Sequence, residues 1–418
     1  MKLCFLADGR SPHTQNWIRY FLKKGHEVHL ISSYPCSTED MPVKSLHIVS
    51  LDFSAKIRAS LFDKGGSSLT THGSPFFSRL RGSRLWSVIA RMRDYTVPAA
   101  INKKKWYVRS LVKQIQPDLV HAMRVTYEGV LAAFALENST FPLILSVWGI
   151  DFTWQTQFSD KSRRMVERAL GRADALHPDC YRDLRLAQEL GFGSAKPALV
   201  VPGNGGVHTD IFHPGLRNKE FCTQWSIPED APVVINPRGV KPYIRTDIFF
   251  QAIPLVLSKK PQTIFLGAMM QGNAFAENWM ARLGIGSATR LLPYVPHQEM
   301  AAFFHTADVT ISPSDHDGTP NTLLESMACQ SFPVAGNIES VREWIDDGVN
   351  GLLCDQSRPE SVASAILHAL DDTALRHSAG KRNWQLINDR AEYQKVMKRV
   401  EHFYDEAISQ AQNRKIHK

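Results

Sequence analysis

The stretch from Ile311 to Gln330 reads ISPSDHDGTPNTLLESMACQ, and its pattern predicts a buried strand, a short loop and then a helix. Thr319 is a good N-cap residue and Pro320 suits the first helical position, so we expect the helix to begin at this pair. Gly318 allows a tight turn or the close approach of a ligand. The stretch is therefore typical of an α/β fold whose ligand lies at the end of a strand.

The start of this predicted helix is a candidate anion site. Backbone N–H groups and the positive end of the helix dipole converge there, so a diphosphate would fit against it. Asp317 precedes the helix, while Asn321 and Glu325 share one of its faces. Ionised carboxylates only accept hydrogen bonds, which suits the vicinal hydroxyls of a ribose or a sugar ring. The simpler interpretation is that Asp317 caps the helix and Glu325 is an ordinary helix residue.

A second candidate lies in the stretch NPRGVKPYIR at residues 236–245, which follows a predicted strand. A guanidinium group binds two phosphate oxygens at once, so Arg238 at the strand end is suited to neutralise a diphosphate. The alternative is that Arg238 is a surface arginine of a basic protein.

Short apolar runs alternate with helical patterns along the whole chain, which predicts parallel sheets in two α/β domains that face each other across a cleft. A Pro- and Gly-rich break at residues 202–232 separates the two halves. The expected boundaries are 1–205, 206–385 and a C-terminal helical segment at 386–418 that packs toward the first domain. Predicted strands cover 3–7, 28–31, 119–120, 143–148, 198–201, 233–235, 263–266, 309–311, 333–335 and 352–354.

Composition and missing motifs exclude several classes of protein. The chain has 418 residues with 43% hydrophobic and 22% charged residues, which excludes fibrous and disordered classes. Six scattered cysteines without a Cys-x-x-Cys pair argue against a disulfide scaffold and predict reduced core residues. No Gly-x-Gly-x-x-Gly follows the first strand, which argues against a dinucleotide cofactor. The Asp315-His316-Asp317 pattern resembles a divalent-metal motif, but it directly precedes the helix and we expect no metal.

Basic residues are concentrated between Asp52 and Lys113. This window holds 13 Lys and Arg against three Asp, so its net charge is +10. The net charge of the whole chain is +8, so the rest of the chain carries −2. A solvated basic face on helices, an anionic membrane contact and a small acidic ligand all fit this charge. No nucleic-acid-binding motif is present, so we expect no nucleic acid as partner.

Together these residues resemble family 4 of the retaining nucleotide-sugar glycosyltransferases, which have the two-Rossmann GT-B fold. The most specific similarity is an acid, seven residues and then Glu, here Asp317 and Glu325, followed by Pro333-Val334. Further segments that look like family motifs are PDLVH at 117–121, VPGNGG at 201–206, DIFHP at 210–214 and NGLL at 350–353. The resemblance implies an acceptor-binding N-terminal domain and a nucleotide-sugar-binding C-terminal domain.

The resemblance also implies roles for the candidate residues. Asp317 would contact hydroxyls of the donor sugar, Glu325 the donor ribose and Arg238 the diphosphate. Val295 would lie beside the base. Backbone amides would come from the stretch Gly318, Thr319, Pro320 and Asn321, in which Pro320 itself has no N–H group. The family generally needs no metal, because basic residues and the helix start stabilise the leaving diphosphate.

Departures from the family pattern give further candidates. The first acid is Asp317 where Glu is usual. The family's second phosphate-binding lysine has no aligned match, and Lys241 or Arg245 would replace it. His121 is a candidate sugar or acceptor contact. Gly9 stands where a Gly-Gly pair often marks the first loop, and we expect His13 in that region to face the acceptor.

The sequence therefore predicts a cytoplasmic, metal-independent retaining glycosyltransferase without a cofactor. It would move a hexose or N-acetylhexosamine from a nucleoside diphosphate to a carbohydrate or lipid-linked acceptor. The basic window favours an anionic or lipid-linked acceptor at the inner membrane face, as in cell-envelope polysaccharide or glycolipid assembly. The alternatives are a nucleotide-sugar 2-epimerase of the same fold and a non-catalytic sugar-nucleotide-binding subunit.

Overall fold

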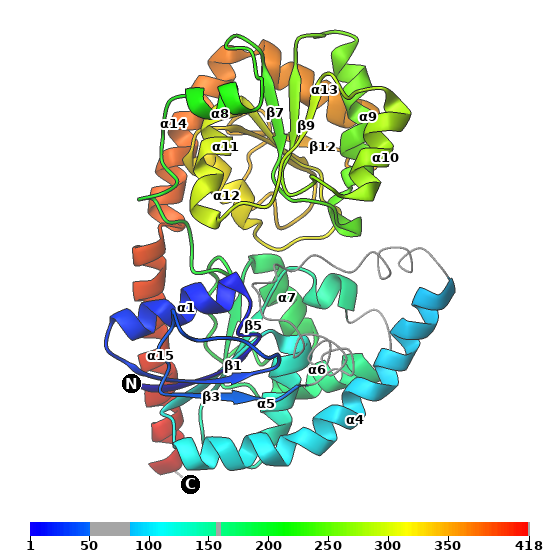
Figure 1. The fold of residues 1–418 in the computed structure, drawn as a ribbon. Coiled ribbons are helices and arrows are strands. Elements are labelled where there is room, and N and C mark those ends of the chain that lie inside the picture. The colour runs from blue at the N-terminus through cyan, green and yellow to red at the C-terminus, as the bar shows by residue number, and fades with distance from the viewer. Residues whose placement is uncertain (51–83, 156–159, 417–418) are drawn as a thin grey trace. The chain divides into compact units, whose positions relative to one another are not determined.

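A parallel sheet of six strands forms the centre of each of two structural units (Figure 1). The computed structural model describes residues 1–50, 84–155 and 160–416. Unit 1 comprises residues 1–179, 183–204 and 399–418, and unit 2 comprises residues 180–182 and 205–398. The fold class predicted from the sequence, α/β with two Rossmann-like sheets, is confirmed.

In unit 1 the strand order is β3-β2-β1-β4-β5-β6, and all neighbouring strands are parallel. The strands are β1 (Lys2–Ala7), β2 (Glu27–Ser32), β3 (Ser45–Ile48), β4 (Leu119–Met123), β5 (Leu143–Val147) and β6 (Ala175–Pro178). One sheet face packs on α4 (Arg84–Ile115), α5 (Val130–Ala135), α6 (Asp160–Arg172) and α7 (Tyr181–Glu189). The other face packs on α1 (Pro12–Lys23) and on the later part of α15 (Tyr393–Ile416).

In unit 2 the strand order is β12-β11-β10-β7-β8-β9, again fully parallel. The strands are β7 (Val233–Asn236), β8 (Ile264–Gly267), β9 (Thr289–Leu291), β10 (Val309–Ser312), β11 (Phe332–Gly336) and β12 (Leu352–Cys354). One group of helices comprises α8 (Lys219–Gln224), α11 (Met300–Thr306), α12 (Asn321–Ala328) and α14 (Thr373–Arg390). A second group comprises α9 (Thr246–Leu257), α10 (Ala274–Leu283) and α13 (Pro359–Asp371), so separate apolar cores cover the two faces.

Each sheet has one point at which the strand order reverses. In unit 1 the chain winds outward from β1 in one direction and from β4 in the other, and in unit 2 it does so from β7 and β10. The loops that follow these two neighbouring strands diverge to opposite faces at the carboxyl edge of the sheet, and this point of divergence is called the crevice of the unit. The crevice of unit 2 lies where the sequence places the candidate site.

The short strands account for the errors in the strand prediction. Residues 198–201 are not a strand, because only an isolated bridge joins Ala198 to Leu176. The edge position belongs instead to β6, whose four residues include a histidine and a proline and give a weak apolar signal. β3 and β9 were also not predicted. Among the described residues, five of the six cysteines are buried and all six are unpaired, as expected.

A chain of buried hydrogen bonds joins α15 to the sheet of unit 1. Trp17 Nε1 donates to Tyr404 Oη at 2.8 Å, and Tyr404 Oη contacts His121 Nδ1. His121 Nε2 lies 2.7 Å from Ser146 Oγ, which lies 2.8 Å from His177 Nδ1. His177 Nε2 reaches the carbonyl of Val201 at 3.2 Å.

All of these groups are satisfied if both histidines are neutral and carry their proton on Nε2. Each group then donates to the next, from the Trp17 indole to the Val201 carbonyl, without any conflict between donors. Burial lowers the pKa of His177 to about 4 and that of His121 well below its usual range. The neutral state that the hydrogen-bond chain requires is therefore also the state that burial favours.

Replacing Tyr404 by Phe should destabilise unit 1, because it leaves the Trp17 indole and the His121 ring without their buried partner. The expected loss is about 2–3 kcal/mol in the free energy of unfolding, measured by urea denaturation. Tyr107→Phe is the matched control, because the Tyr107 ring is exposed on α4. Equal stability of the two variants would contradict the proposed hydrogen-bond chain.

Candidate functional site

An ion pair spans the crevice of unit 2. Arg238 follows β7, Asp317 follows β10, and Arg238 Nη1 donates a hydrogen bond to Asp317 Oδ2. Both side chains are largely buried. Burial lowers the pKa of Arg238, but Asp317, together with Tyr243 and Glu325, raises it by more, so the pKa lies above its ordinary value and the guanidinium stays charged. The structure thus brings together the predicted diphosphate-binding and sugar-binding residues.

Backbone contacts fix the loop that carries Asp317. Its carbonyl oxygen accepts hydrogen bonds from Arg182 Nη1 at 2.6 Å and from Ser340 Oγ at 2.8 Å. The Gly318 amide donates to Asp317 Oδ1 at 3.1 Å, and Trp344 Nε1 donates to Thr319 Oγ1 at 3.2 Å. Arg182, Ser340 and Trp344 were not predicted from the sequence, because no local motif marks them.

Helix α12 begins one residue later than predicted. Its first residue is Asn321 and its N-cap is Pro320, whose ψ of 108° is extended. The Pro320 carbonyl accepts from the amides of Leu323 and Leu324, at 2.9 and 3.2 Å. The prediction that Thr319 is the N-cap was therefore wrong, because the carbonyl that accepts the first hydrogen bonds of the helix is that of Pro320. The helix start remains at the carboxyl end of β10, where an anion would meet it.

Glu325 lies one turn into α12 and is paired with a histidine. Its side chain is buried, and Oε1 lies 2.7 Å from Nε2 of His297, which is half exposed. Burial lowers the pKa of His297, but the hydrogen bond and charge of Glu325 raise it by more, so the pKa lies above its usual value. Val295, two residues earlier, is partly buried against the apolar core that α12 also lines. His297 was missed because it follows β9, a strand that was not predicted.

The two candidates for the second phosphate contact differ in their surroundings. Arg245 has a left-handed backbone (φ 46°) and pairs with Asp247 through Nε and Nη2, at 3.1 and 3.0 Å. Its Nη1 lies 3.7 Å from Asp315 Oδ2. The hydrogen bond to Asp247 raises the pKa of Arg245. Lys241 is exposed, with its ammonium 6.0 Å from the centre of the Tyr243 ring. Each carboxylate of the Asp-x-Asp pattern thus lies beside an arginine.

Several buried polar atoms at this edge of the sheet have no hydrogen-bond partner among the described residues. Buried polar groups are normally satisfied, so such atoms mark positions that a ligand can occupy. They belong to residues at the end of β7, at the end of β10 and at the start of α12. These atoms are Asn236 Nδ2, Ser312 Oγ, Ser314 Oγ and Thr322 Oγ1.

His121 was predicted to contact sugar or acceptor, and its position argues against that role. It lies in β4 with 1% of its surface exposed, and both ring nitrogens hydrogen-bond to the protein, to Tyr404 and Ser146. The side chain faces α1 and α15, so it belongs to the core of unit 1. The sequence could not reveal this, because Tyr404 lies 283 residues further along the chain.

Gly9 and His13 lie at the carboxyl edge of the unit 1 sheet. A Cβ atom at Gly9 would lie 2.5 Å from Cys36 Sγ, and the Gly9 amide donates to Ser32 Oγ at 3.1 Å. A larger residue here would displace the Cys36 side chain, so packing within the protein favours a glycine. The His13 ring, in the first turn of α1, lies 5.4 Å from the Trp148 ring, which follows β5.

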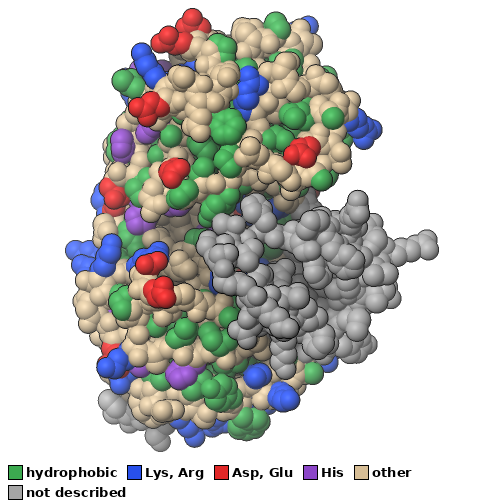
Figure 2. All heavy atoms as spheres, viewed as in Figure 1, with side chains coloured by type: hydrophobic (Ala, Val, Ile, Leu, Met, Phe, Trp, Pro, Cys, Tyr) green, Lys and Arg blue, Asp and Glu red, His purple; other side chains and the backbone are tan. Residues whose placement is uncertain are grey.

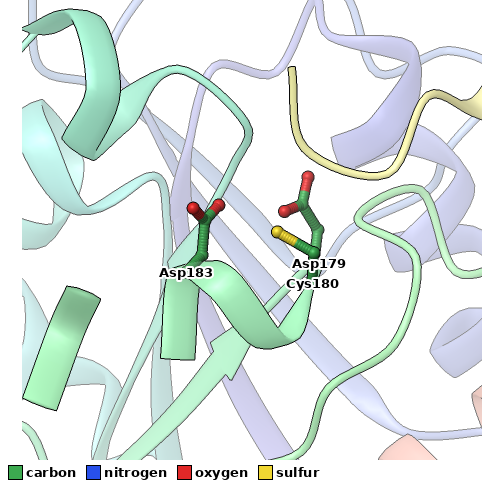
Figure 3. A group of neighbouring side chains, drawn as sticks. All are labelled: Asp179, Cys180 and Asp183. Atoms are coloured by element: carbon green, nitrogen blue, oxygen red, sulfur yellow. The ribbon is translucent and has the colours of Figure 1, made fainter. Parts of the chain in front are cut away.

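Asp179, Cys180 and Asp183 form a buried group near the start of α7 (Figure 3). The Cys180 sulfur lies between the two carboxylate groups in this view. The Asp179 carboxylate accepts from the Gly149 amide at 3.2 Å. Each of the three side chains offers one atom that could bind a metal ion, and these atoms lie within 4.8 Å of one another.

Two family models match the chain. The model described as "Glycosyl transferases group 1" matches residues 218–385, and the model described as "Glycosyl transferase 4-like" matches residues 2–65 and 78–179. The chain belongs to the group 1 glycosyltransferases. One model falls on unit 1 and the other on unit 2, so both units belong to glycosyltransferase families.

The relatives of this glycosyltransferase are distant. A D-inositol 3-phosphate glycosyltransferase from Thermobispora bispora is 26% identical over 288 residues, which cover 60% of this chain and 67% of that protein. One from Streptosporangium roseum is 29% identical over 202 residues, 46% of each chain. The match thus spans two thirds of the first relative and about half of the second.

Two solved structures share the fold. Sucrose-phosphate synthase from Thermosynechococcus elongatus has a TM-score of 0.72 and 14% identity, and the match covers 98% of this chain and 100% of that one. Anabaena HepE in complex with UDP and glucose has a TM-score of 0.70 and 14% identity, with 97% and 100% covered. These similarities establish the GT-B fold.

Removing either partner of the Arg238–Asp317 pair should destabilise unit 2, because the other charge stays buried without compensation. We expect Arg238→Met and Asp317→Asn each to lower the free energy of unfolding by about 3 kcal/mol. The double variant should lose clearly less than the sum of the two, and urea denaturation measures all four proteins. Additive losses would show that the pair contributes no coupling.

Proposed function

We propose that this glycosyltransferase transfers a hexosyl or N-acetylhexosaminyl group from a nucleoside diphosphate to an acceptor, with retention of anomeric configuration. The observation that carries the proposal is the arrangement in unit 2 of Arg238, Asp317 and Glu325 around the start of α12. The unpartnered polar atoms at the same edge support a ligand there. HepE, of similar fold, was solved with UDP-glucose, which supports a nucleotide-sugar donor.

The residues of the site take distinct roles in this proposal. Arg238 and the amides at the start of α12 hold the diphosphate and stabilise the charge that develops on it when the sugar leaves. Asp317 accepts hydrogen bonds from the sugar and Glu325 accepts them from the ribose. Val295 lies beside the base, and Arg245 or Lys241 gives the second phosphate contact. Cationic side chains and the helix start replace a metal ion in this scheme.

Features of α4 support a peripheral membrane contact. Trp106 is 62% exposed, and it lies beside Lys103, Lys104 and Lys105 in the basic window. An exposed tryptophan among lysines suits the interface of an anionic bilayer. In the described part of the chain, no helix has the length and apolar character to cross a bilayer. Residues 52–83 of the window lie outside the described residues, so the membrane contact and the cytoplasmic location stay predictions.

Figure 2 shows how the charged side chains of the described residues are distributed on one face of the molecule. On the face in Figure 2, basic and acidic side chains of the described residues are interspersed. The +10 charge of the basic window is known from the sequence of that segment. The proposed role in cell-envelope polysaccharide or glycolipid assembly rests on this basic segment.

Glu325→Ala and Arg238→Ala should each lower transfer from a nucleotide sugar by 100-fold or more, because each removes a contact to the donor or to its leaving group. The assay measures release of nucleoside diphosphate with and without an acceptor, which also separates transfer from epimerisation. Glu277→Ala and Arg282→Ala are the controls, since both side chains are exposed on α10. Full activity of both site variants would contradict the assignment of the site.

Donor affinity should depend on pH through His297. Its pKa is raised by Glu325, so the imidazolium compensates the buried carboxylate at lower pH. As pH rises through that pKa, the uncompensated Glu325 charge repels the diphosphate, and UDP should bind about threefold more weakly. Calorimetric titration from pH 6 to 8 measures this, with His297→Gln as comparison. A wild-type affinity that does not change with pH would refute the coupling.

A further inference from the structure

The crevice of unit 1 contains a buried carboxylate that no role above uses. Glu128 lies in a π-helical turn (η1, Val125–Gly129) that directly follows β4, and Ser33 directly follows β2. Ser33 Oγ donates a hydrogen bond to Glu128 Oε1. Glu128 is 4% exposed, and its Oε2 has no hydrogen-bond partner among the described residues. This unsatisfied oxygen is at the point where the strand order reverses, the place where α/β sheets bind ligands.

A second unsatisfied group follows the next strand. Trp148 comes directly after β5, the neighbour of β4, and its indole N–H is buried without a partner among the described residues. The indole N–H can only donate and the carboxylate oxygen accepts. The same edge of the sheet therefore offers one acceptor and one donor, which is the pattern that hydroxyl groups satisfy.

Among the described residues, the charges at this edge are unfavourable for an anion. Arg10 binds Asp8 through Nε and Nη2 at 3.0 and 2.9 Å and stacks on the Tyr34 ring at 3.8 Å. Arg124 Nε binds Asp151 at 3.0 Å. Each of these two arginines thus faces a carboxylate of its own, and Glu128 adds a third carboxylate. A phosphate group would gain little from cations that are already compensated.

We propose that the acceptor binds at this edge of unit 1 through a neutral, hydroxyl-rich group, a polyol or an unphosphorylated sugar, one hydroxyl of which donates to Glu128 Oε2. This inference rests on the function proposed above, because it names the class of acceptor for that reaction. It also narrows the sequence-based expectation of an anionic acceptor: any anionic or lipid part of the acceptor lies away from this edge. The relatives named above act, by their names, on an inositol phosphate.

The titration of Glu128 provides a separate readout. The pKa of Glu128 is raised to about 7. Burial is the largest cause and the Asp8 charge acts in the same direction, while the Ser33 hydrogen bond and the Arg124 charge oppose them. The carboxylate is therefore ionised above about pH 7 and protonated below it. Since the ionised form accepts more strongly from a hydroxyl, acceptor binding should be stronger at pH 8 than at pH 6.

The experiment uses the full chain and saturation-transfer NMR. The probes are matched pairs: myo-inositol with inositol 3-phosphate, and methyl glucoside, methyl galactoside and methyl N-acetylglucosaminide with their 6-phosphates. UDP, GDP and ADP are first ranked by the rise in melting temperature that each causes. Each pair is then measured at pH 6 and pH 8, with and without the best nucleotide. The variants are Glu128→Gln, Ser33→Ala and the control Glu137→Gln, whose side chain is exposed in the same unit.

The expected result is binding of a neutral probe that is stronger at pH 8 than at pH 6. Glu128→Gln should weaken this binding at least tenfold at pH 8 and remove its pH dependence, while the nucleotide still raises the melting temperature as before. Glu137→Gln should bind the probe as the unchanged protein does. Ser33→Ala should weaken the binding less, and this variant keeps the test valid if Glu128→Gln does not fold. Three results would overturn the inference. They are that only phosphorylated probes bind, that no probe binds, or that Glu128→Gln binds every probe as strongly as the unchanged protein does. If no nucleotide raises the melting temperature, the proposed donor site is contradicted instead.

Discussion

The ion pair between Arg238 and Asp317 joins the two loops that diverge from neighbouring strands in unit 2. Although β7 and β10 send their connections to opposite faces of the sheet, this ion pair and a hydrogen bond from the Asp315 amide to the Tyr243 carbonyl at 2.9 Å link the two loops. A buried pair costs desolvation, which mutual attraction offsets only when the geometry is well fixed. Here the Asp317 backbone is fixed by Arg182 and Ser340, so the cation and the anion are held in position at the crevice.

The two units share one strand order but differ in the chemistry at their carboxyl edges. Unit 2 places an arginine and the start of α12 at the crevice, whereas unit 1 places Glu128 there and compensates each nearby arginine with an aspartate. The topology determines where a ligand binds, and the residues of the loops determine which ligand it is. On the proposed function, the first unit binds hydroxyl groups and the second binds a diphosphate, which is the division of tasks that a transfer reaction requires.

Much of this arrangement was predictable from local sequence. The stretch 311–330 predicted strand, loop and helix to within one residue, because capping and apolar spacing are local properties. Contacts between distant residues were not predictable. His121 looked like a ligand in the sequence, yet Tyr404, 283 residues away, makes it part of the core. Likewise His297 meets Glu325 only because the segment after β9 reaches α12, and the sequence pattern did not indicate β9.

The pairing of Arg238 with Asp317 has a consequence for the order of events at the proposed site. Because the loop backbone is fixed, the position of the Asp317 carboxylate depends on its side chain alone, and the guanidinium restrains that side chain. A diphosphate offers the same guanidinium a stronger, doubly charged partner. When Arg238 turns to the phosphates, a carboxylate oxygen becomes available to the sugar hydroxyls. Recognition of the sugar is then coupled to recognition of the diphosphate, so a free sugar without its nucleotide meets a carboxylate that is already paired.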